Sequence, residues 1–187
     1  MNKVMKEMIN TLLYLLGVLC LTWFVIAFVG QRTEVDGSSM EPMLSDGDNL
    51  IVDKLTYRFK DPERFDIIVF PVYNDNTKAE TFFIKRIIGL PGETVWIDEG
   101  GNIYINDERL PESYGREIIM SGRRGLFIGR DRNNPVVLED DEYFVLGDNR
   151  NHSTDSREIG NIHRDDIIGR AWVRIWPFSR LGFLKHQ

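Results

Sequence analysis

The feature that most constrains the fold is an uncharged, strongly apolar stretch near the N-terminus, residues 11–30, which reads TLLYLLGVLCLTWFVIAFVG. In a helix these 20 residues span about 30 Å, the thickness of the hydrocarbon core of a bilayer. The stretch is apolar on all faces, whereas a helix that packs on a soluble core has a polar face. We therefore expect an uncleaved transmembrane anchor over residues 11–30, after a short N-terminal segment, residues 1–10.

Two other N-terminal signals fit the sequence less well. A cleaved signal peptide has a shorter apolar region and small residues before the cut, but here Phe28 and Val29 precede Gly30. A lipoprotein signal needs a small residue before the modified cysteine, and Leu19 before Cys20 is bulky. An anchor that stays attached to residues 31–187 is the interpretation that remains.

The charges beside the stretch predict its orientation. Lys3 and Lys6 precede it, and Arg32 follows it. Positive residues collect on the cytoplasmic side of membrane proteins, so this mild excess predicts a cytoplasmic N-terminus and an extracytoplasmic domain, residues 31–187. The net charge of −6 comes from charges of both signs without a basic stripe, so nucleic acid is not expected as a partner.

After residue 31 the pattern changes to short runs of β-branched and aromatic residues, separated by turn residues. These runs are 49–52, 66–70, 94–97, 102–105, 142–146 and 167–175. Residues 99–102 (EGGN) are typical of a hairpin turn, and the polar stretch 111–135 is expected to be a surface excursion of an inserted lobe. The predicted fold is a mostly antiparallel β domain, compact or barrel-like.

A lysine in unusual surroundings is the first candidate for catalysis. Lys85 lies within FFIKRIIG, residues 82–89, where alternation along a strand gives it one face with Phe83 and Ile87. Burial lowers the pKa of a lysine, and a neutral lysine can act as a base. The alternative is a lysine that reaches solvent from a half-buried strand or pairs with an acid.

Ser39 is the candidate partner of this lysine. It lies in GSSMEP, residues 37–42, shortly after the apolar stretch, so an anchor would hold it near the bilayer. A serine hydroxyl is a poor nucleophile without an adjacent base, and Lys85 could supply one. Gly-Ser-Ser is also an ordinary turn composition. The pair nevertheless favours a Ser/Lys hydrolase that works at a membrane surface.

A third segment, residues 147–157, reads GDNRNHSTDSR and contains no aliphatic side chain. Such a composition is typical of a solvated loop. It also fits a hydrogen-bonded loop that supports a catalytic site.

Together these segments resemble the type I signal peptidases, the membrane-bound Ser/Lys endopeptidases of peptidase family S26, and are most similar to the single-anchor bacterial type. Four blocks carry the resemblance, in the order of the family and after the anchor: 39–44, 64–70, 85–93 and 147–157. The resemblance implies an all-β catalytic core with an inserted smaller β lobe at about residues 94–140. It also implies that neither a metal nor another cofactor is needed.

The resemblance implies a role for each matching residue. Ser39 matches the nucleophile of an acyl-enzyme mechanism, Lys85 matches the general base, and Ser153 matches the serine that orients the lysine ammonium. The loop that supports the site is matched by Asp148, Arg150, Asp155 and Arg157, of which the last two are expected to form an ion pair.

The resemblance also implies the substrate and its location. The family cuts signal peptides from exported preproteins at the outer face of the cytoplasmic membrane, after small residues at the first and third positions before the cut. An extended substrate could pair with residues 35–37 and 82–84. The candidate walls of its pockets are Val35, Met40, Leu44 and Ile84, although ordinary core packing uses the same residue types. Signal peptides and membrane lipid are thus the expected partners.

Two positions depart from the family pattern. Gly37 stands where some members have a hydroxyl residue that donates to the oxyanion, so backbone amides, chiefly that of Ser39, are expected to do so here. Met43 stands where a threonine is usual. The remaining polar signals do not predict a metal site, because His152, His163 and His186 lack ligand spacing and the acidic run 139–142 is typical of a solvated turn.

Two other functions share parts of this pattern. A self-cleaving, repressor-type Ser/Lys protease has the dyad and the core, but the anchor and residues 147–157 argue against it. A membrane-anchored β module that only binds exported chains would not need Ser39, Lys85 and Ser153 together.

Overall fold

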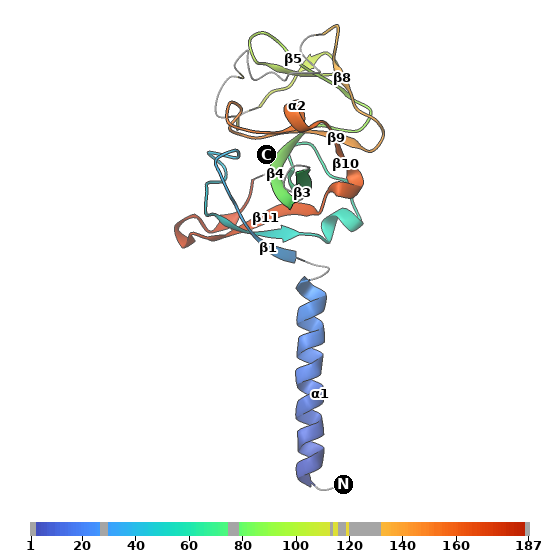
Figure 1. Ribbon diagram of the computed structural model, residues 1–187, viewed down its shortest axis with the longest axis vertical. Coiled ribbons are helices and arrows are strands. Elements are labelled where there is room, and N and C mark those ends of the chain that lie inside the picture. Colours follow the sequence, from blue (N-terminus) through green and yellow to red (C-terminus); the bar gives the residue numbers. More distant parts are fainter. Residues whose placement is uncertain are drawn as a thin grey trace.

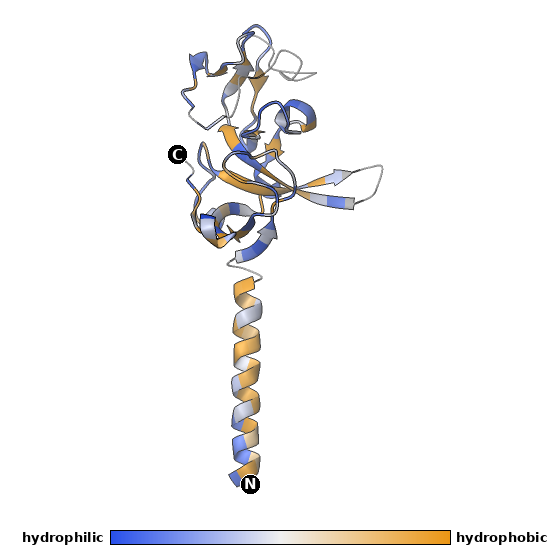
Figure 2. Cartoon of the chain, turned by 90° about the vertical axis from the view of Figure 1, so that its left-hand side faces the viewer, coloured by the Kyte–Doolittle hydropathy of each residue, from blue (hydrophilic) through white to orange (hydrophobic). Residues whose placement is uncertain are grey.

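The structure is a computed structural model that describes residues 3–26, 30–74, 79–112, 114, 115, 119 and 132–185. One long helix stands below a body of β-sheet (Figure 1). This helix, α1 (Lys3–Phe24), has no buried residue. It is the one helix in the described residues that is long and apolar enough to cross a membrane, and apolar residues cover most of its length (Figure 2). It begins before the predicted stretch 11–30, and Gly30 already belongs to the first strand.

The larger sheet has eight strands, and all of its described pairs are antiparallel. Its main path runs β1-β2-β11-β3-β4-β9-β10, with β12 paired to β11. The strands are β1 (Gly30–Glu34), β2 (Asn49–Asp53), β3 (Ile67–Asn74), β4 (Ala79–Gly89), β9 (Glu142–Leu146), β10 (Ile162–His163), β11 (Gly169–Trp176) and β12 (Gly182–Phe183).

A second antiparallel sheet of four strands lies at the end of the body far from α1 (Figure 1). Its order is β7-β6-β5-β8. The strands are β5 (Thr94–Ile97), β6 (Ile103–Ile105), β7 (Glu108–Arg109) and β8 (Val136–Val137). They come between β4 and β9 in the chain, so this sheet is an insertion into the larger one. The expected lobe, residues 94–140, spans these strands.

Four short helical elements connect the strands: η2 (Thr56–Arg58), α2 (Ser156–Ile159), η4 (Arg164–Asp166) and η5 (Phe178–Arg180). Helix α2 falls at the end of the polar segment 147–157. The Asp155 side chain caps it by accepting a hydrogen bond from the Arg157 amide.

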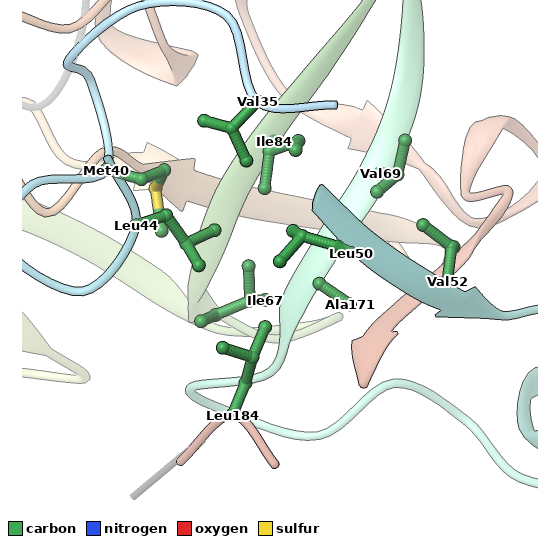
Figure 3. Close-up of a cluster of buried hydrophobic side chains, with 10 residues drawn as sticks. All are labelled: Val35, Met40, Leu44, Leu50, Val52, Ile67, Val69, Ile84, Ala171 and Leu184. Carbon is green, nitrogen blue, oxygen red and sulfur yellow. The ribbon is translucent and has the colours of Figure 1, made fainter. Parts of the chain in front are cut away.

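Three clusters of buried hydrophobic side chains hold the sheets together, and β4 contributes to all three. Ile84 belongs to the cluster between the sheet and residues 35–44 (Figure 3). Ile88 belongs to the cluster of the inserted lobe, and Ile87 to the third. A Cβ at Gly89 would lie within 2.7 Å of Val95 and Leu138 side-chain atoms, so a glycine there allows the lobe to pack closely on β4.

The prediction of a mostly β fold with antiparallel sheets is confirmed. Each of the six predicted runs overlaps a strand, and Gly101 has a positive φ of 76° in the predicted hairpin turn. The pattern of residues in the sequence does not predict the short strands β1, β7, β8, β10 and β12 or helix α2. These elements have two to five residues, too few for a periodic pattern.

Candidate active site

Ser39 and Lys85 meet although 46 positions separate them in the chain. Ser39 lies in a turn closed by a hydrogen bond of 3.1 Å from the Glu41 amide to the Ser38 carbonyl. The next turn is closed by a bond from the Leu44 amide to the Met40 carbonyl, and the side chains of Met40 and Leu44 are buried. Lys85 projects from β4, where Ile67 and Ile68 of β3 pair with Arg86 and Lys85. Lys85 Nζ donates to Ser39 Oγ over 2.8 Å and to the Ile84 carbonyl over 2.9 Å.

The environment of Lys85 favours its neutral form. The residue is 4% exposed, and its Nζ lies 4.9 Å from the centre of the Phe83 ring. Burial lowers the pKa of Lys85 to about 8, against the opposing attraction of Asp155 and Asp148. A fraction of the lysine is therefore neutral near neutral pH and can accept a proton from the serine.

The loop 147–157 holds the backbone on both sides of Ser39. The Asn149 amide donates to the Ser39 carbonyl over 3.0 Å, and Asn149 Nδ2 donates to the Ser38 carbonyl over 3.1 Å. Asn149 was not singled out from the sequence, where its place within the polar block is the one signal available. These bonds fix the turn that carries the candidate nucleophile.

Gly147 lies where the loop comes closest to this turn. A Cβ there would be 2.5 Å from the Ser39 carbonyl oxygen and closer still to Ser153 Oγ. Ser153 is buried, and its hydroxyl forms no hydrogen bond within the part of the chain that the structure describes. The hydrogen bond that the lysine ammonium would donate to the Ser153 hydroxyl oxygen, which the resemblance implies, is therefore not formed in this structure, and the role of Ser153 stays a prediction.

The charged residues of the loop form buried ion pairs. Arg157 binds Asp155 through two hydrogen bonds of 2.7 Å, and this is the pair expected from the sequence. Asp155 also accepts from the Gly147 amide over 3.0 Å. Asp148 binds Arg86, the residue that follows Lys85 on β4, through hydrogen bonds of 2.8 and 2.7 Å.

Arg150 extends these contacts to the inserted lobe, where Glu112 accepts two hydrogen bonds from it. Neither Arg86 nor Glu112 was singled out from the sequence. Arg86 carries the same signal as Lys85, a cation in an apolar run, whereas Glu112 lies in a polar stretch without any distinguishing pattern.

A groove of about 350 Å³ passes the Ser39–Lys85 pair. It is formed by residues 34–40 and 81–85, with His152 and Thr154. Of the four pocket candidates, Val35, Met40 and Ile84 line the groove. The fourth, Leu44, does not line it and is fully buried in the cluster of Figure 3.

The Ser39 backbone amide is a hydrogen-bond donor of a residue that lines this groove. In the described structure, no acceptor takes the Ser39 amide hydrogen. Gly37 has a positive φ of 87°, and its own amide donates to Asp46 over 2.8 Å. The Ser39 amide is therefore the donor closest in the chain to the hydroxyl that would attack.

The described residues contain no group of three or more His, Cys, Asp or Glu side chains that could hold a metal ion. His163 contacts the Asp141 carboxylate at 3.2 Å on the surface, and this carboxylate raises the pKa of His163. His186 lies outside the described residues.

Comparison with known proteins places this chain in a family. Residues 6–176 match the family described as signal peptidase, peptidase S26. The chain is 41% identical to a probable signal peptidase I-2 of Synechocystis sp., over 96% of this chain and 75% of the relative. It is 43% identical to a signal peptidase I of Leptolyngbya laminosa, over 84% and 74%, and 36% identical to one of Bacillus caldolyticus, over 86% and 92%. The chain belongs to the signal peptidases of peptidase family S26, a family of hydrolases.

Proposed function

We propose that this protein is a membrane-anchored serine endopeptidase that removes signal peptides from exported preproteins, with Ser39 as nucleophile and Lys85 as general base. The observation that carries the proposal is the 2.8 Å contact between Lys85 Nζ and Ser39 Oγ, made by a lysine that is almost completely buried. Nucleophilic catalysis by serine has two requirements. The base must lie within hydrogen-bond distance of the hydroxyl, and it must be able to lose its own proton. The Ser39–Lys85 pair supports both.

In the first half of the reaction, neutral Lys85 takes the hydroxyl proton as Ser39 Oγ attacks the carbonyl carbon of the scissile peptide bond. The carbonyl oxygen becomes an oxyanion, to which the Ser39 amide can donate. When the C–N bond breaks, the Lys85 ammonium gives its proton to the leaving amine. The products are the free N-terminus of the mature protein and an ester between Ser39 and the signal peptide.

In the second half, the mature protein leaves and a water molecule takes its place. Lys85 removes a proton from this water, whose oxygen attacks the ester carbonyl. The Lys85 ammonium then returns a proton to Ser39 Oγ as the ester bond breaks, and the signal peptide is released with a new carboxylate. The dyad is restored, and the overall reaction consumes one water.

The groove supports binding of an extended peptide. Strand β9 pairs only with Arg86, Ile87 and Gly89 of β4, so residues 81–84 have one edge without a partner strand among the described residues. A peptide that enters the groove can add to this edge as a further strand. Val35, Met40 and Ile84 are then in place to line shallow apolar subsites that accept small side chains.

The anchor supports cleavage at a membrane surface. Residues 25–29 separate helix α1 from β1, and residues 34–40 of the groove begin at the last residue of β1. With the N-terminus in the cytoplasm, the catalytic domain is exposed on the outer face. A protease added to the outside of intact spheroplasts should then digest the domain, while a cytoplasmic marker protein stays intact. Protection of the domain until the membrane is broken would reverse the proposed orientation.

The central test uses a purified preprotein and the full-length protein in detergent. Wild type is compared with Ser39→Ala and Lys85→Met, and the new N-terminus of the product is sequenced. Ser179→Ala, at an exposed serine outside the groove, and Lys60→Met, at an exposed lysine, are matched controls. We expect cleavage by wild type and both controls, after a small residue with another two positions before it, and no detectable cleavage by the two dyad variants.

Other outcomes would exclude the proposed base, or would favour a self-cleaving protease or an anchored binding module. Cleavage by Lys85→Met at the wild-type rate would exclude this lysine as the base. A wild type that cuts its own chain and leaves preproteins intact would support a self-cleaving protease. A wild type that binds a preprotein without cutting it, although a known signal peptidase cuts the same preprotein, would support an anchored binding module.

A further inference from the structure

The inserted lobe reaches the loop 147–157, the catalytic loop of the proposed peptidase, through residues 110–112, 114 and 115, which follow β7. The Leu110 amide donates to the Ile103 carbonyl over 2.8 Å, and the side chains of Leu110 and Tyr114 pack on the hydrophobic cluster of the lobe. This segment therefore belongs to the lobe. Its polar side chains nevertheless point to residues of the larger sheet and of the loop 147–157.

Glu112 makes the strongest of these contacts. Its carboxylate accepts two hydrogen bonds from Arg150, one from Nη1 over 2.6 Å and one from Nη2 over 2.5 Å. The Arg150 side chain is 1% exposed and that of Glu112 is 20% exposed. A pair of parallel bonds to a carboxylate fixes the plane of a guanidinium as well as its position.

Arg150 transmits this orientation to the candidate nucleophile. Its Nε donates to the Gly147 carbonyl over 3.0 Å. Gly147 in turn lies against the Ser39 carbonyl, with no room for a side chain between them. Arg157 Nη2 donates to the Arg150 carbonyl over 2.7 Å, which ties the same residue to the Asp155–Arg157 pair.

Tyr114 makes a second contact between the lobe and the site. Its ring lies 4.2 Å from the guanidinium carbon of Arg86, which follows Lys85 on β4. The ring also meets Phe65 edge to face, with 5.2 Å between centres. The lobe thus contacts both cations that support the catalytic loop, Arg86 through a ring face and Arg150 through a carboxylate.

We propose that Glu112 is a positioning residue of the peptidase: it fixes Arg150, and through Arg150 it fixes Gly147 against Ser39. The inference rests on the Ser/Lys activity proposed above. Glu112 touches no reacting atom, so it acts on the rate only through the geometry of the dyad. The inserted lobe then has a function in catalysis, because it supplies the carboxylate that neutralises a buried cation of the catalytic loop.

The physical reason lies in the burial of Arg150. A buried cation that loses its carboxylate is unfavourable, so the guanidinium is expected to turn toward solvent. That movement releases the Gly147 carbonyl, and a displacement of about 1 Å at a reacting group is enough to lower a rate roughly 100-fold. Substrate binding depends on residues 34–40 and 81–85, which do not contact Glu112, and should change little.

The test measures kcat and KM separately for full-length Glu112→Ala, Glu112→Gln and wild type on one peptide substrate. Asp107→Ala is the matched control, because it removes an exposed ion pair with Arg132 in the same lobe. We expect kcat to fall about 10- to 100-fold in Glu112→Ala with KM within about threefold of wild type. Glu112→Gln, which keeps one acceptor of nearly the same shape, should recover part of kcat, and Asp107→Ala should match wild type.

A double-mutant cycle with Arg150→Met separates positioning from a general effect on folding. If Glu112 acts through Arg150, adding Glu112→Ala to Arg150→Met should lower kcat no further. A full additional loss on that background, or a wild-type kcat in either Glu112 variant, would overturn the proposal. If Glu112→Ala does not fold, the kcat of Glu112→Gln and a cycle that combines Glu112→Gln with Arg150→Met decide in its place. A wild type without peptidase activity would instead refute the proposed function.

Discussion

The guanidinium of Arg86 and the carboxylate of Asp148 form an ion pair with both side chains at most 1% exposed. Arg86 follows the candidate base Lys85 on β4, and Asp148 follows Gly147 at the start of the catalytic loop. Arg86 Nη1 also donates to the Phe65 carbonyl over 3.0 Å. The pair thus joins the strand that carries the candidate base to the loop that holds the candidate nucleophile.

Removal of one partner of this pair should destabilise the protein strongly. Arg86→Met leaves the Asp148 carboxylate buried without its two hydrogen bonds, so we expect the free energy of unfolding to fall by roughly 3–5 kcal/mol. Arg132→Ala, which breaks the exposed pair with Asp107, should cost less than about 1 kcal/mol. Chemical unfolding in detergent measures both, and equal losses in the two variants would contradict a structural role for the buried pair.

The cleavage rate should depend on pH through the protonation of Lys85. Its neutral form is the proposed base, and burial lowers the pKa of Lys85 to about 8. Below this pH the rate kcat/KM should fall about tenfold for each pH unit, because the neutral fraction falls by that factor. A pH profile on a substrate without ionisable groups near the cut tests this. A rate that stays constant from pH 8 down to pH 6 would exclude a base with this pKa.

The same burial makes the wild type less stable than a variant without this cation. Lys85 has a lower pKa in the folded protein, about 8, than its ordinary 10.5, so below pH 8 the folded state bears the full cost of the buried charge. We expect Lys85→Met to be more stable than wild type by up to roughly 3 kcal/mol at pH 7. Between pH 8 and 10.5 the unfolded state binds more protons, so wild type gains stability and the difference should shrink. Unfolding at pH 7 and pH 10 measures it, and a less stable Lys85→Met at pH 7 would contradict this assignment.

The parts of the fold and the site that the sequence predicted are those with a local signal. Period-two alternation around Lys85 predicted the strand that presents it, because side chains on a buried strand must alternate. The apolar stretch predicted a helix that could span a bilayer, since length and composition are enough for that. Ser39 and Lys85 were predicted to be partners because a serine nucleophile needs a base. In the structure Lys85 Nζ lies 2.8 Å from Ser39 Oγ.

The parts that were missed depend on distant contacts. Glu112 is one acid in a polar stretch, and only the fold brings it to Arg150, 38 positions away. Leu44 was assigned to a substrate pocket because it is apolar and near the nucleophile, but a core position has the same appearance in a sequence. The difference between the two is set by what packs on the side chain, which depends on the tertiary structure.

Gly147 should tolerate no side chain, because a Cβ there would overlap the Ser39 carbonyl and Ser153 Oγ. We expect Gly147→Ala to lower kcat at least 100-fold by moving Ser39 away from Lys85. Gly182→Ala, at a position with open space around the Cβ, is the matched control and should keep wild-type kcat. A Gly147→Ala variant with normal kcat would show that the loop can move without disturbing the dyad.

Ser153 offers a test that separates a catalytic role from a structural one. Its hydroxyl is buried and makes no hydrogen bond in the described structure, so Ser153→Ala removes an unsatisfied polar group and should leave the free energy of unfolding unchanged or slightly higher. If the hydroxyl turns to hold the lysine ammonium during the reaction, as the resemblance implies, kcat should still fall about 10- to 100-fold. The two measurements are independent of each other. A loss of activity with full stability would support the orienting role, whereas wild-type kcat would exclude it.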